Sequence, residues 1–199
     1  MPRMGLDTDA VLDAACELAD EEGLAATTLT RLANRLGIRS PSLYKHIDGL
    51  DGLQRGLTVR GLEEANRRLR QATIGKARHE ALFALAHAYW RFARERPGLY
   101  TASLRMARPG ENDVARAGEA LLSTLLAVLA GYGVHGDDAL HATRGLRAII
   151  HGFVSLDAAG GFRLSLDLNE SLDRLLWAFL HDLDERTAAD GASTLPVHS

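Results

Sequence analysis

The sequence predicts an all-α protein, and three observations lead to this fold class. Apolar residues recur at helical spacing along nearly the whole chain of 199 residues, as in residues 11–19. The alternating pattern of a half-buried strand is nearly absent. Glycine and proline separate the helical stretches, for example at residues 96–98 and 108–110, where one helix is expected to end and another to begin.

The composition is that of a globular protein with a proper core and excludes several classes. Hydrophobic residues make up 46% of the chain, and a net charge of −3 argues against a basic protein that coats nucleic acid. The single cysteine, Cys16, cannot form an internal disulfide framework, which fits a reducing compartment. No apolar run approaches the ~20 residues of a membrane span, and the first residues lack an apolar signal segment. We therefore expect a cytoplasmic protein with no membrane partner.

The first helix is predicted to begin after Asp7 or Thr8, either of which can cap it, and to end before Gly23. Val11, Ala14, Ala15, Leu18 and Ala19 lie on its inner face. Its other face carries acids, which we interpret as a solvated surface: Asp9, Asp13, Glu17, Asp20 and Glu21.

Two short helices follow, joined by residues 37–39. Thr28 caps the first of them, and Gly37 ends it in the left-handed conformation. Ser40 is expected to cap the second, with Pro41 in its first turn, where a missing N–H costs nothing. This spacing, with a glycine in the turn, predicts a helix–turn–helix.

The outer face of the second short helix indicates what it binds. If Leu43 and Ile47 point inward, small polar residues and Lys45 point outward, as in a helix that reads the DNA major groove. Residues 28–47 contain four basic residues and no acidic one. Free N–H groups at the starts of both helices can also bind phosphates. A plain helical hairpin within an all-α core is the alternative explanation of the same pattern.

Several motifs of this region resemble the N-terminal domain of the tetracycline-repressor (TetR) family, from about residue 6 to residue 57. They are Thr27-Thr28-Leu29, Leu32-Ala33, Leu36-Gly37-Ile38 and Ser42-Leu43-Tyr44-Lys45-His46-Ile47. Together with the basic run, the resemblance implies DNA contacts from Thr28, Thr30, Arg31, Arg39, Ser40, Pro41, Ser42, Tyr44, Lys45 and His46.

One segment departs from the family pattern. Many relatives carry a lysine at the start of the fourth helix, where it grips a phosphate. This chain has Asp48-Gly49-Leu50-Asp51 instead. The departure implies a low DNA affinity, a larger share of the binding for Arg39 and Lys45, or a shifted pose on the operator.

The rest of the chain predicts a larger helical domain. A connecting helix over about 50–72 has Leu50, Leu53, Leu57, Leu62, Ala65 and Leu69 inward. Further helices are expected at about 76–95, 97–105, 112–132, 136–159 and 167–188. We therefore predict a helix–turn–helix DNA-binding domain at 1–55, a helical effector-binding and dimerisation domain at 56–190, and a disordered tail at 191–199.

Residues 144–162 resemble a TetR C-terminal subtype that is marked by Trp-His-Gly and a Gly-Gly-Phe turn, with Ile150 in place of the tryptophan. The resemblance implies a homodimer and a small, hydrophobic effector. The predicted pocket residues are Tyr89, Phe92, Tyr100, Leu104, His151 and Phe153. The predicted dimer interface comprises Ile149, Leu156, Leu172, Leu176, Phe179 and Leu180.

His151 has three explanations. It can be a core side chain that hydrogen-bonds a carbonyl, an effector contact or a metal ligand, and we favour the core role. The other histidines show no spacing that suits metal ligands, so we predict no metal and no cofactor besides the effector.

The sequence as a whole predicts a sequence-specific DNA-binding transcriptional regulator, a ligand-responsive repressor that acts as a homodimer on a palindromic operator of double-stranded DNA. No catalytic motif stands out, so we expect no enzyme. The alternatives are a helical small-molecule-binding or interaction module, or a helical enzyme, with a weakened helix–turn–helix.

Overall fold

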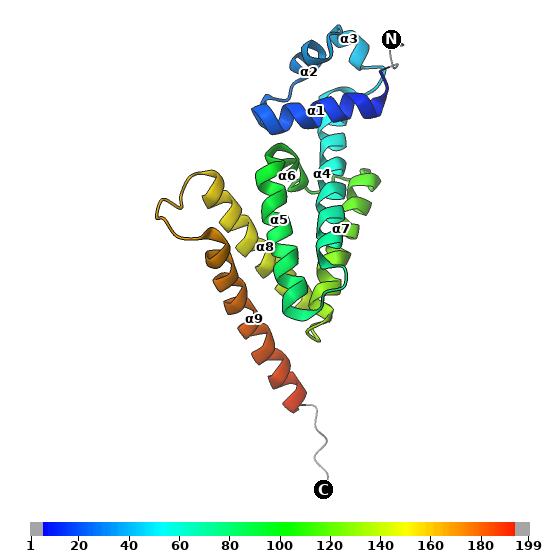
Figure 1. Ribbon diagram of the computed structural model, residues 1–199. Helices are drawn as coiled ribbons and strands as arrows, with labels where there is room; N and C mark the ends of the chain where they lie inside the picture. The colour runs from blue at the N-terminus through cyan, green and yellow to red at the C-terminus, as the bar shows by residue number, and fades with distance from the viewer. Residues whose placement is uncertain (1–5, 194–199) are drawn as a thin grey trace. The chain divides into compact units, whose positions relative to one another are not determined.

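The computed structural model describes residues 6–193, and all regular secondary structure in this range is helical (Figure 1), which confirms the predicted fold class. The helices are α1 (Thr8–Glu22), the short 3-10 helix η1 (Leu24–Ala26), α2 (Leu29–Leu36), α3 (Ser40–Leu43), α4 (Gly49–Thr73), α5 (Arg78–Glu95), α6 (Pro97–Ser103), α7 (Asn112–Ala130), α8 (Gly136–Ala158) and α9 (Leu168–Ser193). Of the tail predicted at 191–199, residues 191–193 belong to α9, and the remainder lies outside the described residues.

Local signals place most of the early helix ends. The Asp7 side chain caps α1 by accepting the N–H of Ala10 at 2.8 Å, and Thr28 caps α2 in the same way. Gly37 ends α2 with a φ of 65°, which is strained for any residue with a side chain. The predicted cap at Ser40 is wrong, because α3 begins at Ser40 itself. Arg39 holds the cap position, without a side-chain hydrogen bond.

The chain forms two compact units, and their boundaries differ from the predicted domain boundary at residue 55. The first combines the residues up to Arg67 with Phe92–Leu121, and the second combines Arg68–Arg91 with the residues from Leu122 onward. The first unit therefore contains the helix–turn–helix together with α6 and the beginning of α7, which come much later in the sequence.

Two glycines let the helices of the first unit approach each other backbone to backbone. A Cβ atom on Gly98 of α6 would lie 2.2 Å from the carbonyl carbon of Ala19 in α1. A Cβ atom on Gly61 of α4 would lie 2.4 Å from the carbonyl oxygen of Leu99. Helix α6 is thus fitted against both α1 and α4. Leu50, expected to point inward, is 45% exposed because it lies in the first turn of α4, before that helix enters the core.

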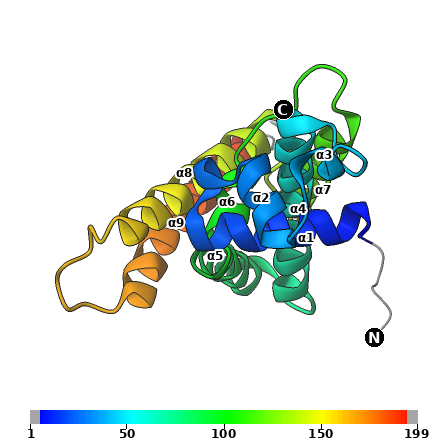
Figure 2. The same cartoon turned by 90° about the horizontal axis from the view of Figure 1, so that it is seen from above.

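The second unit contains α8 and α9, which both views show side by side and joined by a loop (Figures 1 and 2). Aromatic and histidine side chains link α5 to α8 and α9 inside this unit. Trp90 donates to Asp157 at 2.9 Å and meets Phe153 edge to face, with the ring centroids 5.4 Å apart. His87 of α5 lies 2.6 Å from a carboxylate oxygen of Asp173 in α9. None of the described helices is long and apolar enough to cross a membrane.

Candidate DNA-binding surface

Two apolar residues anchor α3 and the turn after it, as predicted, and the polar residues around them are exposed or half-buried. Leu43 is fully buried and Ile47 is 7% exposed, whereas Tyr44 is 62% exposed. Among the predicted DNA contacts, Thr28, Thr30, Arg31, Arg39, Pro41, Tyr44 and Lys45 are exposed, and Ser40, Ser42 and His46 are half-buried. Thr28 is the N-cap of α2, and the other nine lie on α2, on α3 or on the turns that follow these helices.

The glutamates near the end of α1 are exposed, as expected of a solvated surface, but they also pair with arginines of α2. Glu21 and Glu17 accept hydrogen bonds from Arg35 of α2 at 2.6 and 3.2 Å, and Glu22 pairs with Arg31. The hydrogen bond from Arg35 holds the pKa of Glu21 below its usual value. The sequence shows these charges, but it does not show that the short connection between α1 and α2 brings the acids of α1 beside the arginines of α2.

Of the four basic residues in 28–47, pairing with acids of α1 leaves two for a ligand. Within residues 6–193, neither Arg39 nor Lys45 forms an ion pair, and both side chains are exposed. The basic character of the surface therefore rests on these two residues more than on Arg31 and Arg35.

Two contacts tie α3 to its neighbours. The Thr8 hydroxyl of α1 donates to the backbone carbonyl of His46 at 3.1 Å. The ring of Tyr44 lies against the start of α4, where its Cε1 atom is 3.9 Å from the position that a Cβ atom of Gly49 would take. The exposed face of α3 is therefore continuous with the first turn of α4.

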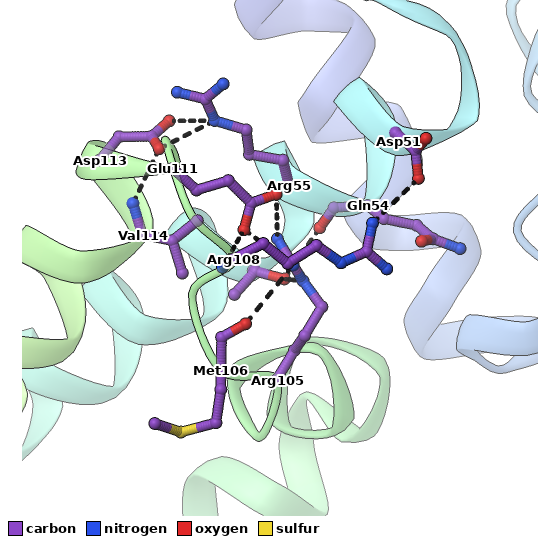
Figure 3. Close-up of polar contacts among 10 residues, drawn as sticks. Asp51, Gln54, Arg55, Arg105, Met106, Arg108, Glu111, Asp113 and Val114 are labelled. Carbon is purple, nitrogen blue, oxygen red and sulfur yellow. Dashed lines mark hydrogen bonds and ion pairs between the residues drawn. The ribbon is translucent and has the colours of Figure 1, made fainter.

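The acidic segment at the start of α4 has a cationic partner that the sequence did not indicate. A guanidinium nitrogen of Arg108, in the loop between α6 and α7, lies 3.3 Å from Asp51 (Figure 3). Nearby, Arg105 donates to Glu111 at 2.9 Å and Arg55 donates to Asp113 at 2.8 Å.

These pairs lower two carboxyl pKa values. The hydrogen bond from Arg105, supported by the Arg108 backbone N–H, holds the pKa of Glu111 below its usual value. Burial acts to raise the pKa of Asp113, but hydrogen bonds from Arg55 and the Val114 N–H outweigh it, so that pKa is also lowered. Both carboxyl groups are therefore charged when they hold the loop to α4.

Asp20 joins α1 to α6. One carboxylate oxygen of Asp20 accepts the N–H groups of Gly98 at 2.9 Å and Leu99 at 3.1 Å, and the other accepts the Nε–H of Arg96. The Asp20 side chain is only 14% exposed. This carboxylate thus caps a helix that begins 77 residues later in the chain.

Comparison with known proteins agrees with this arrangement. The family model described as bacterial regulatory proteins, tetR family, matches residues 11–49, and the tetracyclin repressor-like C-terminal domain matches residues 82–179. The chain is 37% identical over 182 residues to the uncharacterized HTH-type transcriptional regulator YobS of Bacillus subtilis (strain 168), which covers 92% of this chain and 95% of that protein. This chain belongs to the TetR family.

Solved structures share the TetR-family fold. A protein with unknown function from Rhodococcus sp. RHA1 superposes with a TM-score of 0.78 at 21% identity, covering 92% of this chain and 97% of that one. BioQ with its natural double-stranded DNA operator gives a TM-score of 0.61 at 23% identity, covering 90% and 98%. Membership of the TetR family, shown by the family models and the Bacillus subtilis relative, makes this chain a helix–turn–helix transcriptional regulator, as the sequence predicted.

The predicted effector pocket of this TetR-family chain is divided between the two units. Tyr89 and Phe153 are buried in the second unit, and Phe92 and Tyr100 are buried in the first. Leu104 is half-buried. His151 is exposed, so the expected core role for it is wrong, because its position on α8 faces outward from the subunit.

A cavity of about 670 Å³ lies in the first unit, between α1, α4 and α6. Six acidic and three basic side chains line it, with Leu99 and Cys16. Burial raises the pKa of the Cys16 thiol to about 11, so the thiol is neutral. The charged lining does not suit the predicted hydrophobic effector.

The predicted dimer residues fall into three groups. Leu172, Leu176 and Leu180 are at most 3% exposed, because the rest of their own subunit already covers them. Ile149 and Phe179 are half-buried, and Leu156 is 53% exposed. A side chain that is already buried within its own subunit adds no contact area to a dimer interface. Among the six predicted residues, only Ile149, Leu156 and Phe179 can therefore meet a partner.

Proposed function

We propose that this regulator binds a palindromic operator as a homodimer, with α3 and the turn before it in the major groove. The observation that carries the proposal is the exposed face on which Arg39 and Lys45 stand without acidic partners among residues 6–193, while Leu43 and Ile47 anchor the helix. A two-fold symmetric reader selects two inverted half-sites, and these make a palindrome.

The residues of this face have different roles in the proposal. Arg39, Ser42 and Lys45 read or flank base edges in this proposal, because Arg39 directly precedes α3, Ser42 lies on it and Lys45 closely follows its end. Thr28, Tyr44 and His46 contact phosphates and set the register. Arg31 contributes less, because Glu22 competes with phosphate for its guanidinium.

Selection of duplexes from a random pool, followed by gel-shift titration, tests this function. Arg39→Ala and Lys45→Ala should each weaken binding by about 1–3 kcal/mol, because each removes a base-edge contact. Arg116→Ala, which removes an exposed arginine of α7, is the control and should bind like the wild type. Unchanged affinity in both test variants would refute the assignment of α3 as the recognition helix.

For the homodimer, we propose the outward face of α8 as the contact surface. Ala148, His151, Gly152, Ser155 and Leu156 recur at helical spacing, and all five are exposed. A solvated helix face normally carries charged residues, and this stretch has none. Nothing within 4 Å would meet a Cβ atom on Gly152, so a partner helix has room to approach.

Sedimentation of two variants tests the dimer. Gly152→Arg and Leu156→Glu place a charge in a dry contact and should give monomers, while the wild type sediments as a dimer at micromolar concentration. Arg174→Ala, on an exposed site of α9, should leave the dimer intact. A monomeric wild type would contradict the proposal.

We further propose that the effector is a small hydrophobic molecule that binds in the second unit, beside Tyr89 and Phe153. The support is the aromatic cluster that Phe153 forms with Trp90 and with Phe162, whose ring centroid is 4.9 Å away. Phe162 belongs to the Gly-Gly-Phe turn, so this cluster also supports assignment to the Trp-His-Gly subtype. The effector would act by preferring one of two states of the dimer, with a coupling of typically ~1–3 kcal/mol.

Tryptophan fluorescence tests the effector site. The chain has two tryptophans, Trp90, which is buried, and Trp177, which is 55% exposed. In a Trp177→Phe variant all tryptophan emission comes from Trp90. Hydrophobic compounds that change operator affinity should change this emission. A compound that alters operator binding and leaves the emission of Trp90 unchanged would place the effector elsewhere.

A further inference from the structure

We propose that Arg108 is a DNA-phosphate contact, supplied by the loop between α6 and α7. The inference rests on the proposed DNA-binding face and adds to it a residue that lies more than sixty positions beyond α3. Arg108 would bind the phosphate that lies next to Tyr44 at the start of α4.

Contacts place Arg108 at the N-terminal end of α4, the end that follows the DNA-binding face in the chain. The ring of Tyr44 lies against Gly49, the first residue of α4. Asp51 is two residues further on, about 3 Å along the helix axis. A guanidinium nitrogen of Arg108 is 3.3 Å from a carboxylate oxygen of Asp51 (Figure 3). The positive charge of Arg108 therefore lies on the same end of α4 as the ring of Tyr44.

The loop that carries Arg108 is held firmly. The backbone N–H of Arg108 donates to Glu111 at 2.9 Å, and Glu111 also accepts two hydrogen bonds from Arg105, at 2.9 and 3.1 Å. Arg105 in turn donates to the hydroxyl of Thr58 on α4 at 3.0 Å. The backbone at Arg108 is thus fixed to α4, and the side chain projects from a defined base.

The side chain itself is bound weakly enough to change partners. The Arg108 and Asp51 side chains are 59% and 85% exposed, and an ion pair so exposed contributes little because water competes for both charges. A phosphate can therefore take the guanidinium from Asp51, or share it. In this proposal, loss of Arg108 also leaves the carboxylate of Asp51 without its cationic partner near the DNA backbone.

Salt-dependent binding tests the proposal, with the selected palindromic duplex and a scrambled duplex of the same length as probes. Loss of one phosphate contact lowers the slope of log K against log salt by about 0.9, which corresponds to about eightfold weaker binding per contact at 0.1 M salt. Arg108→Ala should show this change on both duplexes, because a phosphate contact carries no sequence information. Asp51→Asn should tighten binding, because it frees Arg108. Arg116→Ala is the control for loss of one positive charge.

The outcomes separate this proposal from the proposed function. If Arg39→Ala and Lys45→Ala weaken binding while Arg108→Ala has the affinity and salt slope of Arg116→Ala, the role of Arg108 is refuted and the function of α3 stands. If Arg108→Ala affects only the selected duplex, a base contact replaces the phosphate contact and the proposal is also refuted. If wild-type protein binds neither duplex, both proposals fail. Circular dichroism of each variant shows that the fold is retained.

Discussion

Replacement of Asp20 by alanine should detach the start of α6 from α1 without touching the DNA-binding face. Asp20 accepts two backbone N–H groups of α6, at 2.9 and 3.1 Å, and the Nε–H of Arg96. Gly98 and Leu99 are buried, so water cannot readily replace the lost acceptor. Both N–H groups would be left without a partner.

The expected loss can be estimated from these contacts. Loss of a capping side chain costs roughly 0.5–2 kcal/mol. Loss of a hydrogen bond between charged groups costs about 1.5–3 kcal/mol, and the one-third exposure of Arg96 reduces this to about 1 kcal/mol. Asp20→Ala should therefore lower the free energy of unfolding by about 1.5–3 kcal/mol. Asp20→Asn keeps an oxygen for the two N–H groups and should lose only about 1 kcal/mol.

Urea unfolding followed by circular dichroism measures these differences. Asp13→Ala is the matched control, because the Asp13 side chain is 66% exposed and 3.6 Å from Arg60, which predicts a loss below ~1 kcal/mol. If Asp20→Ala loses no more than Asp13→Ala, the carboxylate does not cap α6, and the reasoning is wrong.

Three further predictions follow from other features. Gly98→Ala should lower the free energy of unfolding by about 3 kcal/mol or more, because its Cβ would overlap the backbone of Ala19. Gly118→Ala has open space around it and should raise the free energy of unfolding by about 0.5–1 kcal/mol, and urea unfolding compares the two variants. The pKa of Cys16 is raised from 9.0 to about 11, so that much less of the reactive thiolate is present at pH 8 in the folded protein. A disulfide reagent should therefore label Cys16 at least about 100-fold more slowly in the folded than in the unfolded protein, and equal rates would contradict its burial. The lowered pKa of Glu111 means that its pairing stabilises the fold above pH 4.5, and that this stabilisation is lost as the pH falls through the lowered value. Glu111→Gln should therefore flatten the decline in the free energy of unfolding between about pH 5 and 3, and parallel curves for variant and wild type would contradict this.

Local sequence patterns correctly predicted the features of the fold that depend only on residues close together in the chain. The spacing of Leu43 and Ile47 is enough to orient α3, and the cap at Thr28 and the stop at Gly37 depend only on residues within one turn of each. Contacts between distant segments had no such signal. Asp20 reaches Leu99 across 79 positions, and a sequence shows it only as one acid in an acidic run.

Apolar periodicity also cannot say what covers a helix face. The stripe that contains Leu172 and Leu176 is completely buried within one subunit, although the same pattern suits a dimer interface. His151 was misplaced for the converse reason. Gly152 beside it permits a close approach between helices and favours a core position for it, but α8 turns both residues outward.

The discontinuity of the first compact unit limits how such regulators can be recombined. A chimera that transplants only residues 1–55 onto another TetR-family body would leave behind α6, whose Gly98 is fitted to the backbone of Ala19 and whose first N–H groups depend on Asp20. The transplanted piece would meet a foreign helix at the point where a single added methyl group is not tolerated. Exchange of DNA specificity between relatives should therefore succeed when Phe92–Leu121 travels with the N-terminal segment, or when only the exposed residues of α3 are changed.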